Sequence, residues 1–561
     1  MNALRRAFIA ASCALASACT SLNSYTNNPL DPPVGAQQAS RASLAVSAER
    51  GNPRVLVMLA LSGGGSRAAY FSAAVMLKLQ TVFPERDLLR EVDVLSSVSG
   101  GSMTAAYYAI SKDARIEDAA LAEAVAPPPP AEPMAPAKLR RQAGSLTCSE
   151  PLTPDEVAAL RERLAGSDRA RDPDYAVRKA ADLCRQASVA SNRPWDEATV
   201  KDLMTRNYVS RWIGNWFWPT NIFNYWFTAF DRSDLMAQTF ADNLFDVAVT
   251  GRDLTFADLN PERPYLIINS TNATGGYCDG KGLPFGAVFT FTDEDFRGYI
   301  NSDLSSYSVA RAVMASASFP VVFANMTLRD YRVHPSCGDA KRYVHVFDGG
   351  NSDNLGLATL KRVLLNAALD GSVAGYDRIV VISIDAFTRP AGTPSSHRDS
   401  RGDFFSFFLD TNLNSAIDSL LQANRDNNLD EFREQADPWT ECAEMSGDRK
   451  RLCDGIRNRL VFYHIGFDNV GEKAMFDELD EDGKPVKVPL TARLDRIPTT
   501  LKLSDEDRRA LDQAVDAIVR PNNGCLIAIR GIVSGAGPSP AEARSACKDA
   551  EPELKPARKK R

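Results

Sequence analysis

Two segments of this chain each combine a buried strand, a glycine-rich turn and a helix, and this repeated pattern limits the possible folds most strongly. The apolar run 54–61 ends at the glycines 63–65 and is followed by apolar residues at helical spacing. The run 92–96 is broken by Ser99-Gly100-Gly101-Ser102, after which a second helical stretch begins. Successive units of this kind are typical of layered α/β proteins. We therefore expect an α/β fold with a central, mostly parallel sheet.

The composition excludes several functional classes. The chain has 561 residues, of which 44% are hydrophobic and 24% charged, values that argue against wholesale disorder and against a multi-span membrane protein. Its formal charge of −6 argues against a nucleic-acid partner. Four histidines and the lack of any C-x-x-C pair make a zinc site improbable, and we predict neither a metal nor a cofactor.

The N-terminus has the pattern of an export signal. Arg5 and Arg6 precede the apolar stretch 7–18, which is too short to span a bilayer, and Cys19 follows. Small residues directly before a cysteine resemble a bacterial lipoprotein signal, in which this cysteine carries lipid, although plain cleavage after Ala18 is the alternative. We expect residues 1–18 to be the signal and residues 19–50 a flexible tether. The predicted location is the bacterial cell envelope, as an outer-membrane lipoprotein facing the periplasm or the exterior.

The rest of the chain divides into three parts by composition. Residues 51–390 carry all the motifs described below and are predicted to form the main domain. Within it, residues of about 111–206 are Ala-rich and charged, which indicates a helical insertion. Residues 391–561 form a C-terminal extension without a recognisable motif. Eight cysteines lie beyond Cys19, and they are either disulfide-bonded, in a pairing that the sequence does not determine, or buried as free thiols.

The second turn matches a nucleophile elbow in all but one position. The segment 97–101 reads S-V-S-G-G, so Ser97 replaces the first glycine of G-x-S-x-G, Ser99 takes the nucleophile position and Gly101 the last glycine. A serine at such a turn has a strained backbone, and large neighbours two positions away would collide. Alone this pattern is weak, because serine and glycine are common at helix starts.

The first turn has the composition of an anion-binding loop. Gly63, Gly64 and Gly65 precede a helix, so their backbone N–H groups can point at one negatively charged oxygen. No Gly-Lys-Ser/Thr follows, and the dinucleotide fingerprint fails at Ala68. An oxyanion hole fits this loop better than a phosphate site does.

A third motif, Asp348-Gly349-Gly350, follows a predicted strand at 343–347. Taken alone, an Asp before two glycines is typical of a turn or a helix cap.

The three motifs in this order resemble the patatin-like phospholipase family. The segment 315–320 resembles the family's A-S-x-A-x-P block, and 348–356 also matches closely. The resemblance covers about 55–386 without the insertion. It implies a three-layer α/β fold with a central, mostly parallel sheet, to which the helical insertion and the C-terminal extension are added.

The resemblance also implies a serine acyl hydrolase with a Ser–Asp dyad. Ser99 would be the nucleophile, Asp348 the base and the loop 63–65 the oxyanion hole. Arg67 would take the family's basic position after this loop, and the small residues of the motifs would support the turns; these are Ser97, Gly101, Gly349 and Gly350. The four histidines have no catalytic context, and alternation along the strand directs His345 away from Asp348.

The segment Trp212–Trp226 contains four of the six tryptophans. It could form a patch that enters lipid head groups, or it could line an acyl pocket inside the domain.

The combined prediction is an exported enzyme that cleaves acyl esters of lipids at a membrane surface. The alternatives are an esterase or thioesterase for smaller acyl groups, and a catalytically silent envelope lipoprotein that uses the fold to bind a ligand.

Overall fold

A computed structural model provides the structure of the chain. It describes residues 27–31, 52–113, 139–142, 145–148, 151–165, 177, 180–181, 184–186, 189–191, 193–245, 247–275, 282–320, 322–332, 342–388, 411–433, 439–471, 473–479 and 484–550. The predicted export signal, Cys19 and nearly all of the predicted tether lie outside these ranges. So do His334 and His397.

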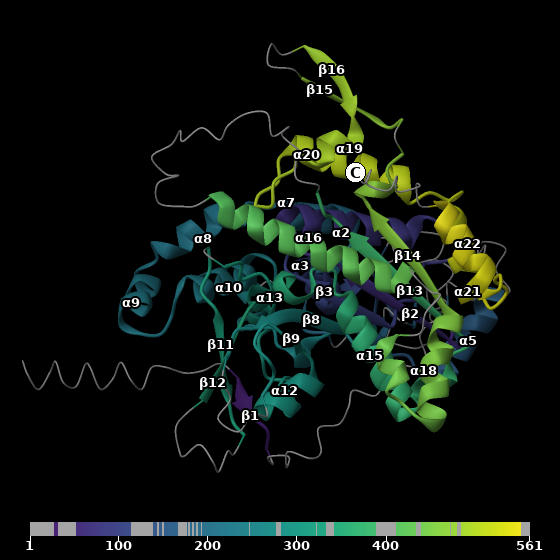
Figure 1. The fold of residues 1–561 in the computed structure, drawn as a ribbon, viewed down its shortest axis with the longest axis horizontal. Helices are drawn as coiled ribbons and strands as arrows, with labels where there is room; N and C mark the ends of the chain where they lie inside the picture. The colour runs from purple at the N-terminus through teal and green to yellow at the C-terminus, as the bar shows by residue number, and fades with distance from the viewer. Residues whose placement is uncertain are drawn as a thin grey trace, which may run out of the picture.

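A central sheet of eight strands organises the molecule (Figure 1). Its order is β11-β12-β8-β3-β2-β13-β14, and β9 also pairs with β8. The run from β8 to β14 is parallel, whereas β9, β11 and β12 join it by antiparallel pairs. The strands are β2 Val55–Leu61, β3 Val94–Val98, β8 Tyr265–Asn272, β9 Val288–Phe291, β11 Met326–Asp330, β12 Arg342–Asp348, β13 Arg378–Asp385 and β14 Leu460–Gly466. The predicted mostly parallel sheet is confirmed.

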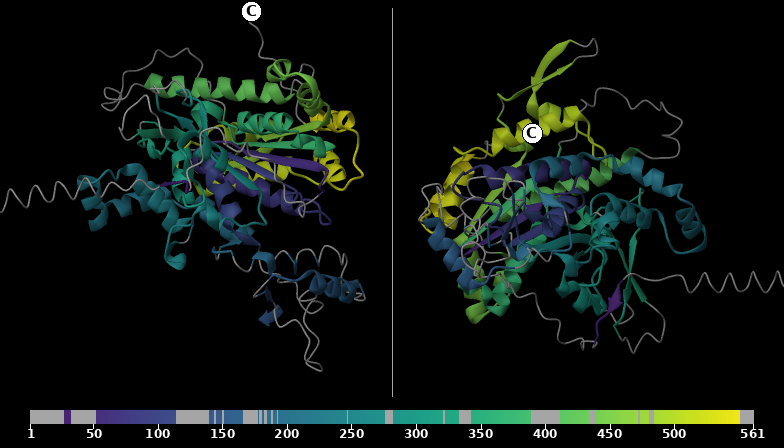
Figure 2. Two further views of the ribbon diagram at one scale, coloured as in Figure 1. Left: turned by 90° about the horizontal axis from the view of Figure 1, so that it is seen from below. Right: turned by 180° about the vertical axis from the view of Figure 1, so that it is seen from behind.

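Helices cover both faces of this sheet, because the side chains of its strands alternate between two separate cores. In β2, Val57 and Leu59 enter one core, whereas Leu56 and Met58 enter the other. The first core contains α2 Gly65–Thr81, α3 Gly100–Ile110, α10 Arg232–Asn243, α13 Val309–Ser316 and α20 Asp505–Ile518. The second contains α15 Leu357–Asp370, α16 Thr411–Arg433 and α18 Gly447–Arg459. The fold is the expected three-layer α/β arrangement, and Figure 2 shows it from two further sides.

The region predicted as a helical insertion also contains short strands. Its helices are α5 Pro154–Ala165 and α7 Glu197–Thr205. Its strand pairs are β4 Lys112–Asp113 with β7 Pro194–Trp195, and β5 Leu139–Gln142 with β6 Ser145–Cys148. Helix α7 packs against α2 through side chains that belong to the first core.

The tryptophan-rich segment folds into two short helices, α8 Tyr208–Trp216 and α9 Pro219–Phe227. We call residues 208–227 the aromatic hairpin. Trp226 is 73% exposed and Trp218 is 65% exposed, so these side chains do not line an interior acyl pocket. Of the two interpretations left open by the sequence, the structure supports the exposed patch.

The C-terminal extension is built into the main domain. Its strand β14 pairs in parallel with β13 and so continues the central sheet. Helix α20 packs on α2, and two disulfides, Cys442–Cys453 and Cys525–Cys547, close loops within the extension. Cys184 is disulfide-bonded as well. The disulfide interpretation of these cysteines is confirmed.

Smaller elements complete the described structure. They are β1 Asn28–Pro29, β10 Ser302–Asp303, β15 Met475–Leu479, β16 Pro485–Pro489, α11 Val247–Thr250, α12 Asp293–Ile300, α14 Gly350–Asp353, α17 Thr440–Ala443, α19 Leu490–Leu494, α21 Gly524–Val533 and α22 Pro540–Ala550. Among the helices in the described ranges, none has the length and apolar character required to cross a bilayer.

Candidate active site

Ser99 occupies a sharp turn between β3 and α3. Its φ of 49° and ψ of −117° lie in a region that residues with side chains rarely adopt, as expected for a nucleophile elbow. A Cβ at Gly100 would collide with the backbone of Gly65, and one at Gly101 would lie 2.7 Å from the carbonyl oxygen of Ser62. The two glycines are therefore required because α3 begins directly against the turn after β2.

Ser97, where the elbow motif has glycine, is fully buried and satisfied. Its hydroxyl donates to the carbonyl of Ile267 at 3.1 Å and accepts from the hydroxyl of Ser102 at 3.1 Å. The departure from the motif thus adds a hydrogen bond between β3 and β8 and leaves the turn intact.

Asp348 ends β12 and faces Ser99, 249 positions away in the chain. The Ser99 hydroxyl donates to Asp348 Oδ2 at 3.1 Å, and the Gly350 N–H donates to Oδ1 at 2.8 Å. The carboxyl group is only 5% exposed, and this burial raises its pKa to about 6, because the two hydrogen bonds only partly offset the loss of hydration. A carboxylate with such a pKa can accept a proton from a hydroxyl near neutral pH.

The turn after Asp348 depends on its glycines. A Cβ at Gly349 would collide with the carbonyl group of Asn269 on β8. The Gly349 N–H donates to the carbonyl of Ser316, and the Asp348 N–H donates to that of Ser318, so α13 and β12 are tied together. Backbone hydrogen bonds therefore fix both the main chain of Asp348 and, through the Gly350 N–H, its carboxylate.

Ser316 and Asn269 also position Ser99, although the sequence did not single them out as site residues. The Ser99 N–H donates to Ser316 Oγ at 2.8 Å, and Ser316 Oγ donates to the carbonyl of Asn269 at 2.5 Å. The Asn269 side chain donates to Ser96 Oγ and to the Ser97 carbonyl, both at 2.9 Å. Ser316 lies in the block that resembles A-S-x-A-x-P, which was the available signal. Asn269 could have been noticed as a polar residue in an apolar strand.

The glycine loop lies against the elbow, and only part of it has free amides. The Gly63 N–H already donates to the carbonyl of Asn354 at 3.0 Å, and the Ser66 N–H donates to that of Thr500 at 2.7 Å. The N–H groups of Gly64 and Gly65 have no acceptor among the described residues. Gly64 and Gly65 have φ values of 136° and 61°, which favour glycine. Free N–H groups beside Ser99 are suited to bind an oxyanion.

Arg67 connects the start of α2 to distant parts of the chain. The side chain is 4% exposed, and its Nε donates to the carbonyl of Ala386 at 2.8 Å. Its Nη1 donates to the carbonyl of Ile497 at 2.5 Å. The arginine after the glycine loop therefore fastens the C-terminal extension to the end of β13.

The two described histidines have other partners. His345 Nδ1 lies 3.0 Å from Thr327 Oγ1 on the neighbouring strand. His464 is buried on β14, three strand positions from β3, and lies between Asp385 and Arg433. Within the described ranges, no group of three or more His, Cys, Asp or Glu side chains is arranged to hold a metal ion.

Comparisons with known proteins place the chain in a family. The model of the patatin-like phospholipase family matches residues 59–361, which is more than half of the chain and includes the glycine loop, the elbow and the Asp348 turn. No curated protein matches significantly. Similar solved structures include human GIVD cytosolic phospholipase A2, with 10% identity and a TM-score of 0.33 over 91% of this chain. This chain covers 64% of that protein.

VipD from Legionella pneumophila is a second similar structure, with 12% identity and a TM-score of 0.27 over 87% of this chain and 69% of its own. The chain belongs to the patatin-like phospholipase family.

Proposed function

We propose that this protein is a serine hydrolase that cleaves acyl ester bonds of lipids, with Ser99 as nucleophile and Asp348 as base. The observation that carries the proposal is the 3.1 Å hydrogen bond from the Ser99 hydroxyl to a buried carboxylate whose pKa is about 6. The position of Ser99 at a strained elbow and the family membership support the same roles.

In the first half of the reaction, Ser99 Oγ attacks the ester carbonyl carbon while its proton moves to Asp348 Oδ2. The carbonyl oxygen becomes an oxyanion, which the free N–H groups of Gly64 and Gly65 stabilise, and the N-terminus of α3 adds its favourable dipole. Collapse of this intermediate breaks the bond to the leaving alcohol, which takes the proton from Asp348. The acyl group remains on Ser99.

In the second half, Asp348 accepts a proton from a water molecule that attacks the acyl-serine. Collapse of the second tetrahedral intermediate breaks the bond to Ser99 Oγ, which recovers its proton from Asp348. The fatty acid leaves and both residues return to their initial states.

The test is hydrolysis of phospholipid vesicles and of a short soluble ester by the purified protein. We expect the wild type to release fatty acid from the vesicles and Ser99→Ala to release none. Ser72→Ala is the control for a serine-to-alanine change outside the site, because Ser72 is fully buried in α2 and its hydroxyl has no hydrogen-bond partner in the described structure.

Two outcomes would replace the proposal. Cleavage of short esters or thioesters without any attack on vesicles would favour the smaller acyl substrates. No cleavage of any acyl ester by folded wild-type protein would favour a silent binding protein.

We also propose that the protein is exported and held at the bacterial cell envelope by a lipid on Cys19. The basic pair, the short apolar stretch and the small residues before this cysteine support the proposal. The disulfides Cys442–Cys453 and Cys525–Cys547 also favour an oxidising compartment.

A further inference from the structure

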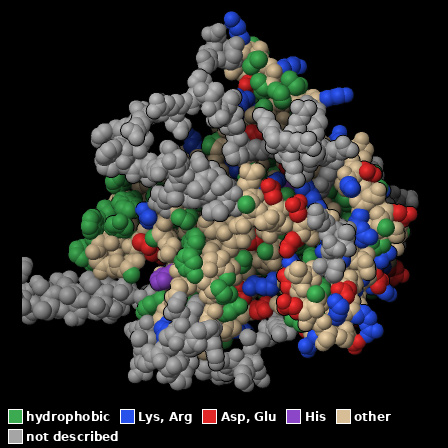
Figure 3. Space-filling view, in the orientation of Figure 1, with side chains coloured by type: hydrophobic (Ala, Val, Ile, Leu, Met, Phe, Trp, Pro, Cys, Tyr) green, Lys and Arg blue, Asp and Glu red, His purple; other side chains and the backbone are tan. Residues whose placement is uncertain are grey.

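The aromatic hairpin exposes more large apolar side chains than any other described part of the chain. Among the described residues, fifteen large hydrophobic side chains are exposed, and eight of them lie in the hairpin: Ile213, Phe217, Trp218, Ile222, Phe223, Tyr225, Trp226 and Phe227. Figure 3 shows green side chains at the left edge of the molecule, where Figure 1 places α8 and α9. Contiguous exposure on this scale marks an interaction site.

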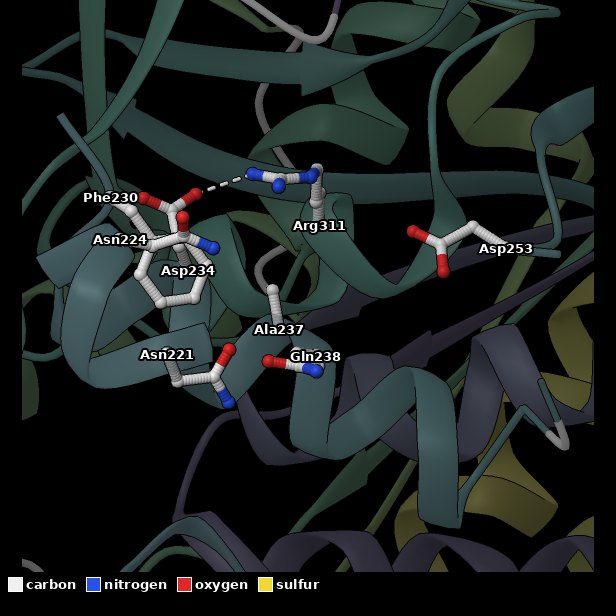
Figure 4. A pocket seen from close by; sticks show the side chains of 8 residues that line it. All are labelled: Asn221, Asn224, Phe230, Asp234, Ala237, Gln238, Asp253 and Arg311. Atoms are coloured by element: carbon white, nitrogen blue, oxygen red, sulfur yellow. Dashed lines mark hydrogen bonds and ion pairs between the residues drawn. The ribbon is translucent and has the colours of Figure 1, made fainter. Parts of the chain in front are cut away.

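The polarity of α9 is the reverse of that expected for a helix on a water-soluble surface. Its only buried residue is Asn221, whose side chain donates to the carbonyl of Asn215 on α8 at 3.0 Å. Asn221 and Asn224 line a cavity of about 220 Å³ together with Gln238 and with Arg311, which is paired to Asp234 (Figure 4). Surface helices normally turn their apolar face inward. Here the amides face the protein, so the apolar face requires an apolar partner.

The chemistry of the exposed face fits a lipid surface. No Asp, Glu, Lys, Arg or His occurs between positions 212 and 230, whereas Trp, Tyr, Phe and Asn are frequent there. Tryptophan and tyrosine prefer the boundary between head groups and acyl chains, because their rings are apolar and carry one polar group. Arg211, at the start of α8, is the hairpin's one basic side chain and donates to Asn243 Oδ1 on α10 at 2.6 Å. The exposed aromatic face itself carries no basic side chain, so it has little attraction for anionic lipids.

The hairpin is fixed to the part of the fold that holds Asp348. The Trp212 ring packs edge-on against Phe323, with centroids 5.5 Å apart, in the loop between α13 and β11. In the same loop, the carbonyl of Ser318 accepts a hydrogen bond from the Asp348 N–H. The rings of Trp216 and Tyr225 are in tilted contact, with centroids 4.7 Å apart, and join the two helices of the hairpin. A bilayer bound to the hairpin would therefore lie on the side of the molecule that carries this loop.

We propose that the aromatic hairpin docks the protein onto a lipid bilayer with electrically neutral head groups. The proposal rests on the proposed function only in that the bilayer would contain the substrate. Docking itself involves no chemistry at Ser99, so it can be measured in protein that cannot cleave lipid.

The experiment is co-sedimentation of Ser99→Ala protein with phosphatidylcholine vesicles. We expect binding that Trp218→Asn together with Trp226→Asn weakens at least about a hundredfold, since each buried aromatic side chain contributes about tenfold or more. The matched control is Phe285→Asn with Leu479→Asn, since these side chains are 70% and 67% exposed but lie outside the hairpin. Both double variants should unfold at the temperature of the parent.

A fluorescence readout tests the same contact directly. Trp218 and Trp226 are the most exposed of the described tryptophans, so vesicles should shift the emission to shorter wavelength. Trp218→Phe with Trp226→Phe should keep the binding and lose most of the shift. Raising the salt concentration should leave the binding nearly unchanged.

Several results would overturn docking. Binding to anionic vesicles only, with loss at high salt, would indicate an electrostatic contact elsewhere. A vesicle-free dimer that the Trp→Asn pair converts to monomer would show that a second copy covers the hairpin. If Ser99→Ala protein does not bind vesicles while wild type cleaves a soluble ester, the docking proposal is wrong and the proposed function stands. If it binds vesicles while wild type cleaves no acyl ester, the proposed function alone fails.

Discussion

Replacing Asp348 by asparagine should make the protein more stable as it removes activity. The buried carboxylate loses hydration on folding, which raises its pKa from 3.8 to about 6. An acid with a raised pKa favours the folded state most when it is protonated. The contribution of Asp348 to the free energy of unfolding is therefore fully present below pH 3.8 and is lost as the pH rises through about 6. Above that pH, the wild type folds against the cost of a buried charge.

The magnitude follows from the two pKa values. At pH 8 the cost amounts to about 3 kcal/mol of unfolding free energy, and at pH 4 it falls to about 0.5 kcal/mol. An amide can preserve the contacts, because Oδ1 still accepts from the Gly350 N–H while Nδ2 donates to the Ser99 hydroxyl. Asp348→Asn should thus be more stable than wild type by up to about 3 kcal/mol at pH 8 and nearly equal at pH 4.

The assay is denaturant unfolding of both proteins at the two pH values. Asp353→Asn is the matched control, since burial also raises the pKa of Asp353 to about 6. Its carboxylate accepts from the Thr359 N–H and the Asn428 side-chain amide, and the backbone N–H groups of Gly356, Leu355 and Ala358 also bond to it, so an amide with one acceptor oxygen cannot serve all these donors. Asp353→Asn should not gain stability. The reasoning would be refuted if Asp348→Asn had no higher free energy of unfolding than wild type at pH 8, or if its gain were the same at pH 4 as at pH 8.

Three further predictions follow from the same geometry. On a soluble ester, kcat/KM should fall about tenfold per pH unit below about pH 6, as Asp348 takes up its proton, and a flat profile down to pH 4 would oppose this role. Gly100→Ala should lower the free energy of unfolding by about 1–3 kcal/mol or more and remove most of the turnover, because its Cβ would meet the Gly65 backbone. Gly275→Ala should change neither quantity much, since a Cβ at Gly275 would have open space around it. Cys19→Ser should move the protein from the membrane fraction to a soluble exported form, and mass spectrometry that finds no lipid on Cys19 of the wild type would exclude the anchor.

The parts of the site that follow local rules could be predicted from the sequence. Ser99 and the loop 63–65 follow the carboxyl ends of the neighbouring parallel strands β3 and β2, where such strands present residues to one edge of a sheet. Asp348 ends β12, which is antiparallel to β8, so for Asp348 the glycine turn marked the end of a strand but not its place beside Ser99. The small residues of the elbow form a pattern within five positions, although the groups that a Cβ at Gly100 or Gly101 would meet lie in the distant turn after β2. The structure brings these segments together, although Ser99 and Asp348 are 249 positions apart.

The contacts that could not be predicted depend on distant packing. Nothing local to Gly63 indicates that the Asn354 carbonyl binds its amide, or that Thr500 from the C-terminal extension covers Ser66. The extension carries no motif, yet its strand β14 continues the sheet beside β13. An edge strand is held by backbone hydrogen bonds that many sequences can form, so its sequence gives little indication of its place. The sequence also left open whether the apolar side chains of the aromatic hairpin point into the protein or into solvent. Periodicity shows that one face is apolar but not which side the protein covers.

The central claim is that Ser99, activated by Asp348, is the nucleophile, and labelling with a fluorophosphonate followed by peptide mass spectrometry tests it most directly. The wild type should acquire one adduct on Ser99, Asp348→Asn should react far more slowly, and Ser99→Ala should stay unlabelled while remaining folded. An adduct on another residue, or equal labelling of wild type and Ser99→Ala, would contradict the account.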